Sequence, residues 1–564
     1  MALTGTCNNA GHNDGNAAPG VGSPGTGTPG AGPPGTGGTF YVTTPIYYPS
    51  EDLHIGNTYT TVVTDTVARY KRLRGYDVRF LTGTDEHGVK IWQNAMKHGV
   101  TPIEYVDPIV GRIKKLWELY EISGYNYIRT TEGRHIDGVR RIFQKLYDSG
   151  DIYKGEYEGW YCVPCEAYYT EAQLTAAGMC PDCEREVKLT KEECYYFRLS
   201  KYQGRLVKHI EENPGFIQPV SRRNEMLNNF LLPGLEDLCV SRATLDWGVG
   251  VPFDERHVVY VWVDALTNYV TALGYGLTGG GDALYQKYWP ADIHFVGKDI
   301  IRFHTIIWPA ILMALGEPLP KQVYGHGFFT VDGVKMSKSR GNVVDPVRLA
   351  GQFGTDAVRY YLLRDIPFGL DGDFTYTALI NRTNSDLAND LGNLLNRTVA
   401  MAAKYFGGAV PAFAAPPDEA CDTELIGLAA STCARVEENL EKLQFNSALA
   451  ELFKLVSRTN KYIDETTAWV LARDESKRDR LAQVMYNLLE SIRIVGILLQ
   501  PFMTRAPSQI FKQIGLGEGT LTEWDSAKRW GAYPAGAAVE PGPVIFPRID
   551  AEKMMAEIKG SACE

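Results

Sequence analysis

Residues 39–72, TFYVTTPIYYPSEDLHIGNTYTTVVTDTVARYKR, contain the local pattern that decides the fold of this chain. The apolar run at residues 40–42 is typical of a buried strand, and the pattern over residues 59–72 predicts a helix. Between them lies the turn LHIGN, which places His54 and Asn57 where that helix would begin. A strand, a polar turn and a helix in this order form the repeating unit of a parallel sheet covered by helices.

The same alternation continues to about residue 374 and predicts an α/β domain with a doubly wound parallel sheet. Polar residues follow four of the predicted strands, at residues 40–43, 78–82, 258–262 and 293–296. Because the carboxyl ends of parallel strands meet along one edge of a sheet, ligands bind there. We therefore expect all four junctions to face one crevice.

A second polar motif, KMSKS at residues 335–339, follows far downstream. Lys335 and Lys338 suit a mobile polyphosphate clamp, and residues 327–333 predict a hairpin that lets the loop project. Unpaired backbone amides at a helix start also favour phosphate, so His54 suits the same ligand. The local alternatives are a solvated basic loop for the lysines and a helix-capping turn for His54.

Four of the ten cysteines form two pairs, Cys162-x-x-Cys165 and Cys180-x-x-Cys183, with fourteen residues between the pairs. This spacing fits a tetrahedral Zn²⁺ site, with chance pairing or redox-active thiols as the alternative. Four thiolate ligands leave no position for water, so we expect the zinc to be structural. The segment interrupts the α/β pattern as an insertion.

From residue 376 to about residue 514 the strand signal disappears, and amphipathic helical patterns predict an α-helical bundle. The predicted helices cover residues 379–406, 423–440, 447–462 and 477–500. Residues 534–547 contain an apolar Val-Ile-Phe that we expect to dock back on the body, and residues 551–559 predict a last short helix.

Composition sets further bounds on the 564-residue chain, whose hydrophobic content of 44% supports several packed cores. Residues 1–38 hold 12 Gly and 5 Pro without Lys or Arg, which predicts a disordered tail rather than a secretory signal. We find no run of eighteen apolar residues, so we expect no membrane span. A net charge of −10 means that any RNA contact must come from local basic patches.

The two signatures, LHIGN and KMSKS, together resemble those of class I aminoacyl-tRNA synthetases. The stretches TTPIYY, TGTDEHG, YVWVDA and FVGKD, which begin at residues 43, 82, 260 and 295, resemble methionyl-tRNA synthetases of the bacterial-type branch. The resemblance covers residues 39–548. This chain departs from the family at Asn57, where the usual motif ends in a second histidine. An amide still donates a hydrogen bond but carries no positive charge.

The resemblance implies a Rossmann-type catalytic domain split by a zinc knuckle and followed by a helical anticodon-binding domain. It divides the chain into the tail (1–38), the first catalytic half (39–149), the knuckle insertion (150–250), the second catalytic half (251–324), a KMSKS-bearing stem-contact region (325–375), the anticodon-binding domain (376–530) and a C-terminal linker and helix (531–564). It implies catalytic roles for His54, Asn57, Lys335 and Lys338. The implied methionine pocket comprises Ile46, Tyr48, Asp85, Trp262, Ala265, Leu266, Tyr269, Ile300 and His304, with Asp85 on the ammonium group. The implied ATP site comprises His54, Gly56, Asn57, Gly297, Asp299, Phe329, Lys335 and Lys338, and the anticodon site comprises Asn393, Arg397 and Trp469.

Local alternatives stay open for three of these residues: Asp85 as a helix cap before Gly88, Asp299 as a cap of the helix at residues 300–315, and Trp469 as an aromatic in the core of a helix. The implied activity is formation of methionyl-adenylate and pyrophosphate, with Mg²⁺ accompanying ATP, and then transfer of methionine to the 3′ end of tRNA(Met). We expect a cytoplasmic monomer or a member of a synthetase assembly, and service to mitochondria as well is left open. The rivals are a class I synthetase for cysteine, a nucleotidyltransferase with the same phosphate signature, and a catalytically silent RNA-binding descendant.

Overall fold

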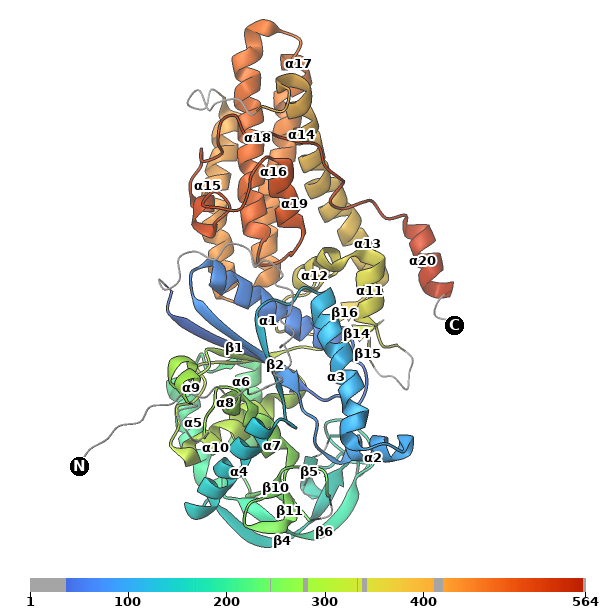
Figure 1. Cartoon of the computed structure of the whole chain (residues 1–564), viewed down its shortest axis with the longest axis vertical. Coiled ribbons are helices and arrows are strands. Elements are labelled where there is room, and N and C mark those ends of the chain that lie inside the picture. The colour runs from blue at the N-terminus through green and yellow to red at the C-terminus, as the bar shows by residue number, and fades with distance from the viewer. Residues whose placement is uncertain are drawn as a thin grey trace, which may run out of the picture.

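The computed structural model describes residues 37–165, 167–169, 171–243, 245–276, 282–331, 333–336, 342–409 and 419–560. Residues 1–36 of the predicted tail and Lys338 of the second signature lie outside these ranges. Three parts are stacked along the long axis in Figure 1: a helical bundle at the top, a parallel sheet in the middle and an antiparallel insertion at the bottom.

The central sheet has six strands in the order β3-β2-β1-β12-β13-β7, and every neighbouring pair is parallel. Its strands are β1 (Thr39–Tyr47), β2 (Asp77–Thr84), β3 (Tyr125–Arg129), β7 (Ile217–Gln218), β12 (Ile293–Gly297) and β13 (Val323–His326). The strand order turns back between β1 and β12, which opens a crevice at their carboxyl ends. The predicted doubly wound sheet is therefore confirmed.

Side chains of β1 alternate between two cores, as the period of a strand requires. Phe40 and Val42 pack in one core with α1 (Ile55–Leu73), whereas Tyr41 packs in the other with α4 (Gly133–Asp148) and α10 (Trp308–Leu315). Further helices of this part are α2 (Val89–His98), α3 (Pro102–Leu119), α5 (Gln203–Glu212), α6 (Val220–Met226), α8 (Asn268–Thr271) and α9 (Ala283–Tyr288). Helices thus cover both faces of the sheet.

The strand predicted at residues 258–262 was expected in the parallel sheet, and this assignment is wrong. The observed strand β11 (Asp254–Val259) pairs antiparallel with β9 (Ser241–Arg242) and β10 (Gly250–Val251), outside the parallel sheet. Val261 and Trp262, which were expected to end this strand, instead start helix α7 (Val261–Leu266). A short apolar run does not reveal which sheet it joins, and here the insertion supplies the nearer partners.

The insertion folds as an antiparallel sheet in the order β5-β4-β6-β8. Its strands are β4 (Ile152–Cys162), β5 (Ala167–Tyr169), β6 (Lys188–Phe197) and β8 (Leu238–Cys239). The cysteine pairs lie at the end of β4 and in the loop between β5 and β6. A third small sheet joins β14 (Phe329–Val331) to β15 (Val334–Lys335) and β16 (Gly372–Phe374), which confirms the hairpin before the second signature.

Beyond α11 (Pro346–Phe353) and α12 (Thr355–Arg364), the chain forms the predicted helical bundle. Its helices are α13 (Tyr376–Arg382), a π-helical segment (Thr383–Gly392), α14 (Asn393–Phe406), α15 (Ala420–Glu441), α16 (Phe445–Thr466), α17 (Ala468–Leu471), α18 (Arg478–Leu499) and α19 (Ala506–Gln513). Among the described residues, one stretch, Glu475–Leu499, has the length and hydropathy to cross a membrane, but 94% of its apolar window is buried inside the protein. It is the central helix of the bundle.

The C-terminal segment returns from the bundle toward the catalytic part, as Figure 1 shows. Val539 and Phe546 are buried, whereas Val544 is 57% exposed, so the predicted docking is confirmed except at Val544. Asn384 exchanges two hydrogen bonds with the backbone of Ile549. The predicted last helix is present as α20 (Ala551–Gly560), which contacts α13.

Candidate active site and its binding surfaces

His54 caps the N-terminus of α1 through one of its two ring nitrogens. Its Nδ1 accepts a hydrogen bond from the Gly56 backbone amide at 3.0 Å, so the ring proton can sit on Nε2. Asn57 completes a capping box, because its Oδ1 accepts from the His54 backbone amide at 3.1 Å. The capping alternative for His54 is therefore present together with a phosphate-directed geometry.

The two signatures meet at this helix end. The Ile55 backbone amide donates to Val344 O at 3.1 Å, five residues after the end of the second signature. A Cβ placed on Gly56 would lie 3.7 Å from Cε of Met336, the second residue of that signature. Lys335 pairs with Thr330 in the β14–β15 hairpin. The hairpin thus carries the start of the second signature directly to the N-terminus of α1.

The residues of the predicted methionine pocket gather at the carboxyl ends of β1 and β12 and on the helices beside them. Tyr269 on α8 bonds His304 Nε2 at 2.8 Å, and His304 Nδ1 donates to Ile300 O at 2.9 Å. Trp262 on α7 stacks on Phe303 with ring centroids 3.8 Å apart. Ala265, Leu266 and Tyr269 are buried, and Ile46, Tyr48, Trp262 and Ile300 are partly buried. The result is an aromatic and apolar wall with few polar tips.

Asp85 follows β2 and is buried, and its backbone amide donates to Tyr47 O at 2.9 Å. The helix-cap alternative is wrong, because α2 starts at Val89 with Gly88 at its N-cap and no side-chain cap bond. At the end of β12, Gly297 precedes the helical segment that includes Asp299. A Cβ on Gly297 would lie 2.4 Å from Asp299 Oδ1, so a side chain at residue 297 would displace the exposed carboxylate of Asp299.

Phe329 occupies a different environment from the other predicted ATP residues. Its ring is buried and meets Tyr59 of α1 edge-on, with centroids 4.7 Å apart. The side chain therefore fixes the hairpin on α1. Lys338 lies outside the described residues, as stated above.

Burial keeps several histidines of this part neutral. It lowers the pKa of His304 to about 4, despite the hydrogen bond to Ile300 O, and lowers the pKa of His326 to about 4. Burial also lowers the pKa of His294 well below its usual range; the Thr43 hydroxyl bonds its Nδ1 at 2.8 Å. Neutral His304 can then accept from the Tyr269 hydroxyl while its Nδ1 donates to the backbone.

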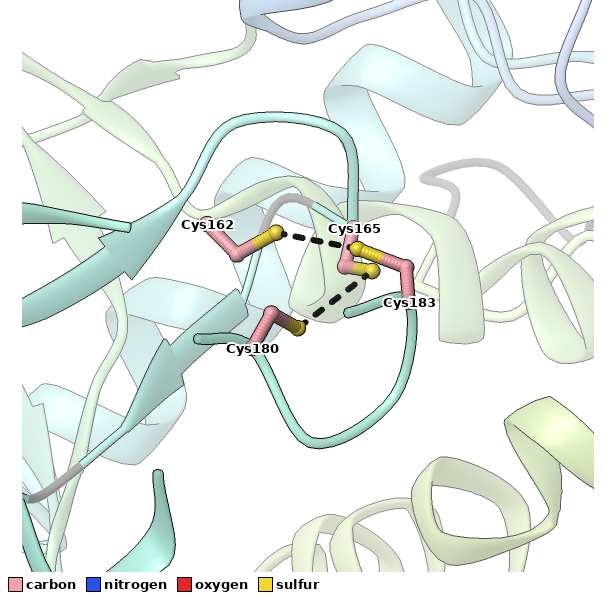
Figure 2. A group of neighbouring side chains, drawn as sticks. All are labelled: Cys162, Cys165, Cys180 and Cys183. Atoms are coloured by element: carbon pink, nitrogen blue, oxygen red, sulfur yellow. Dashed lines mark hydrogen bonds between the residues drawn. The ribbon is translucent and has the colours of Figure 1, made fainter. Parts of the chain in front are cut away.

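The four cysteines of the insertion converge, as Figure 2 shows. Their sulfur atoms lie within 4.8 Å of one another, with Cys162 to Cys183 at 3.5 Å and Cys180 to Cys165 at 3.9 Å. A metal with sulfur ligands at about 2.3 Å in a tetrahedron needs sulfurs about 3.8 Å apart. The cluster therefore fits a metal ion, consistent with zinc.

The predicted anticodon residues lie on the bundle, far along the long axis from the sheet (Figure 1). Asn393 is exposed and Arg397 half-buried one turn further along α14. Arg397 pairs with Asp464 of α16 at 3.0 Å, close to α17. Trp469 on α17 is 39% exposed, so it is not the core aromatic that its helical context alone would indicate.

Sequence reasoning did not assign three residues that the structure brings together beside the pocket. Asp264 bonds His87 Nδ1 at 2.6 Å and His135 Nε2 at 2.7 Å. His87 and Asp264 stand inside the quoted motifs TGTDEHG and YVWVDA, which was the available signal. His135 lies on α4 in no motif, and the sequence offered nothing to single it out.

Two family models match the chain. The model described as tRNA synthetases class I (M) matches residues 40–194 and 184–399, and the model described as the anticodon binding domain of methionyl tRNA ligase matches residues 410–559. With the parallel sheet and the paired signatures, these matches place the chain among the class I aminoacyl-tRNA synthetases.

Individual relatives narrow this class. The chain is 59% identical to the methionine–tRNA ligase of Caldanaerobacter subterraneus subsp. tengcongensis over 92% of its own length and 80% of the relative's. It is 56% identical to that of Bacillus subtilis over 93% and 80%. The Mycobacterium tuberculosis methionyl-tRNA synthetase in complex with methionyl-adenylate aligns with a TM-score of 0.86 and 40% identity over 91% of this chain and 100% of that one. The chain belongs to the methionyl-tRNA synthetase family.

Lowering the pH should destabilise the catalytic part. His304 and His326 have pKa values of about 4 when folded and about 6.5 when unfolded, so the unfolded chain binds more protons between these values. Stability is fully present above pH 6.5 and falls as the pH falls toward 4, by about 2–4 kcal/mol for each histidine.

Urea unfolding followed by tryptophan fluorescence between pH 7 and 4.5 measures this loss, and His326→Gln should flatten the profile. The window avoids Asp264, for which the two facing histidines outweigh burial and lower the pKa to about 2. A midpoint that does not change over this window would contradict neutral buried histidines.

Proposed function

We propose that the crevice at the carboxyl ends of β1 and β12 activates methionine with ATP, releases pyrophosphate, and then transfers methionine to the 3′ end of tRNA(Met). The observation that carries this proposal is the meeting of the two signatures at the N-terminus of α1, together with the mostly apolar set of predicted methionine residues that includes the bonded Tyr269–His304 pair. One part of the crevice suits a triphosphate and the other suits a thioether side chain.

The α1 terminus supplies the fixed part of the phosphate site. The positive end of its helix dipole favours anions, and the imidazole of His54 stands at the N-cap of the same helix. The side-chain oxygen of Asn57 accepts the hydrogen bond from the His54 backbone amide, and its side-chain NH₂ group is a neutral donor. We infer that Lys335 and Lys338 supply most of the positive charge for the β and γ phosphates, with Mg²⁺ accompanying ATP, while the α phosphorus is attacked by the carboxylate.

The pocket supports methionine as the amino acid. Stacked Trp262 and Phe303 offer the polarisable surface that a thioether prefers, and Asp85 supplies a carboxylate for the substrate ammonium group. The cysteine rival needs a zinc ion with an open position for the substrate thiol. In this chain the four sulfur atoms lie close enough together to occupy all four positions of one tetrahedral metal ion, which favours a structural metal.

Methionine-dependent exchange between ATP and pyrophosphate tests the proposed activity. With a panel of amino acids, we expect exchange with methionine, and weaker exchange with near-isosteres, because one methylene changes binding by about 1–3 kcal/mol. Exchange with cysteine alone would establish the rival synthetase. No exchange with any amino acid from folded protein would favour the silent RNA-binding descendant.

We also propose that the cysteine cluster holds one structural Zn²⁺. The knuckle approaches the pocket through Arg302, whose guanidinium lies 3.9 Å from Asp182 and faces the Tyr169 ring at 5.9 Å. Arg302 precedes Phe303 and His304 by one and two residues. Zinc would order the loop that carries these contacts, because thiolate coordination fixes both CxxC turns.

Replacing one ligand should release the metal. Cys180→Ser should lower the zinc content from about one per chain to near zero and slow methionine activation, because the knuckle loses its order. Atomic absorption and the exchange assay measure the two effects. Cys433→Ala, at a buried cysteine of the bundle, is the control and should keep its zinc. Equal zinc content in both variants would contradict the site.

Exposed Asn393 and Trp469, with half-buried Arg397, support an anticodon surface on α14 and α17. Arg397 pairs with Asp464 near the end of α16, directly before α17, and unpaired loop bases stack on guanidinium and indole planes. Helix α17, which carries Trp469, lies at the end of the bundle away from the sheet (Figure 1). A monomeric state and a cytoplasmic location stay predictions from the sequence.

Trp469→Ala should raise the KM for tRNA in aminoacylation about 10–100-fold, because stacking of one base contributes about 1–3 kcal/mol. The tRNA-independent exchange rate should stay unchanged. Trp92→Ala removes a tryptophan of similar exposure, 38% against 39%, from the catalytic part and serves as the control for aminoacylation. An unchanged KM for tRNA in the Trp469 variant would remove this residue from the anticodon surface.

A further inference from the structure

A buried chain of hydrogen bonds lies behind the predicted methionine pocket. Asp264 is fully buried and accepts from His87 Nδ1 at 2.6 Å and His135 Nε2 at 2.7 Å. His135 Nδ1 lies 2.7 Å from the Thr271 hydroxyl, which is buried as well. The four side chains come from the loop after β2 and from α7, α4 and α8.

The members of this chain stand in a regular relation to the pocket. His87 follows Asp85 by two residues, Asp264 follows Trp262 by two, and Thr271 follows Tyr269 by two. Three segments that carry predicted pocket residues thus each contribute one further side chain, two residues later, to the same network. His135 is the member that comes from outside the pocket segments.

The hydrogen bonds of this network require one ring proton on each histidine. A proton on Nδ1 of His87 and on Nε2 of His135 satisfies both carboxylate oxygens of Asp264, and the Thr271 hydroxyl can donate to the remaining nitrogen of His135. A buried carboxylate with two donors is stable, whereas loss of one donor leaves it strongly destabilised. The network therefore has one satisfied arrangement.

Close packing fixes its outer members. A Cβ on Gly138 of α4 would lie 2.5 Å from the Thr271 methyl group, so α4 and α8 approach as closely as glycine allows. On the other side, the His87 ring meets the Trp247 indole edge-on at 5.2 Å, and that indole donates to Glu86 O at 2.7 Å. The loop bearing Asp85 is thereby held between two rigid neighbours.

We infer that Asp264 is a positioning residue for amino-acid recognition, which through His87 and His135 holds the loop of Asp85 in register with the helices of Trp262 and Tyr269. The inference rests on the proposed function, because it concerns the distance between an ammonium partner and a side-chain pocket. A misplacement of about 1 Å can cost about a hundredfold in rate. The network should therefore govern methionine recognition more than ATP binding, whose predicted residues lie at the N-terminus of α1, on the hairpin and at the end of β12.

Pairs of variants separate positioning from folding. His87→Ala and His135→Ala each remove one donor to Asp264, whereas His87→Asn and His135→Gln keep an amide N–H close to the lost Nδ1 and Nε2 positions. In tRNA-independent exchange, the alanine variants should raise the KM for methionine at least about 10-fold, with the KM for ATP within about twofold. The amide variants should recover most of that loss.

Asp264→Ala removes the partner of both histidines, so it should raise the KM for methionine as the two alanine variants do. Adding His87→Ala to it should therefore raise that KM little further. Asp422→Ala is the matched control: it removes an equally buried carboxylate, bonded by Arg480 in the bundle, and should lower the unfolding temperature without changing either KM. If Asp264→Ala does not fold, the His87 and His135 pairs still give the answer.

Equal rises in both KM values, or no recovery in the amide variants, would overturn the positioning role and leave a purely structural network. Wild-type protein without methionine-dependent exchange would overturn the proposed function instead. The two failures are therefore distinguishable in the same assay.

Discussion

A buried carboxylate in the middle of α1 holds the catalytic part together. Asp65 is fully buried and pairs with Arg69 and with Arg359 of α12, each at 2.7 Å, and it accepts from the Ser123 backbone amide at 2.9 Å. Burial raises its pKa, but the two arginines outweigh burial and lower it. Because an unpaired buried charge costs several kcal/mol, α1, α12 and the loop after α3 keep one mutual arrangement.

Because α1 is fixed in position, its N-terminus can contribute to the proposed phosphate site while its C-terminus contacts the bundle. Its N-terminus presents the His54 cap to the crevice, beside the hairpin of the second signature. Its C-terminus reaches the bundle, where Lys71 pairs with Glu441 and Arg74 with Glu437 of α15. One rigid helix thus connects the phosphate site with the domain that carries the anticodon surface, and α12 supports it from the side.

Much of this architecture could be predicted because it follows from local pattern. The period of the apolar residues gave the helices of the bundle to within a few residues, and β1, β2 and β12 stood where polar turns followed apolar runs. The strand around residue 258 was assigned to the wrong sheet, because strand pairing depends on partners that are distant in sequence. The hairpin at residues 327–333 could be predicted, since its turn chemistry is local.

The sequence alone determined the paired signatures, the cysteine spacing and the sets of residues that the family resemblance assigned to methionine, ATP and the anticodon. Each is a short pattern of residue types, and a short pattern can be recognised in the sequence without knowledge of the tertiary structure. Only the tertiary structure decided that Gly56 lies against Met336, that Trp469 faces outward and that Asp264 joins His87 to His135. These contacts bring together residues tens to hundreds of positions apart, and the burial that strengthens them arises only when the separate elements pack.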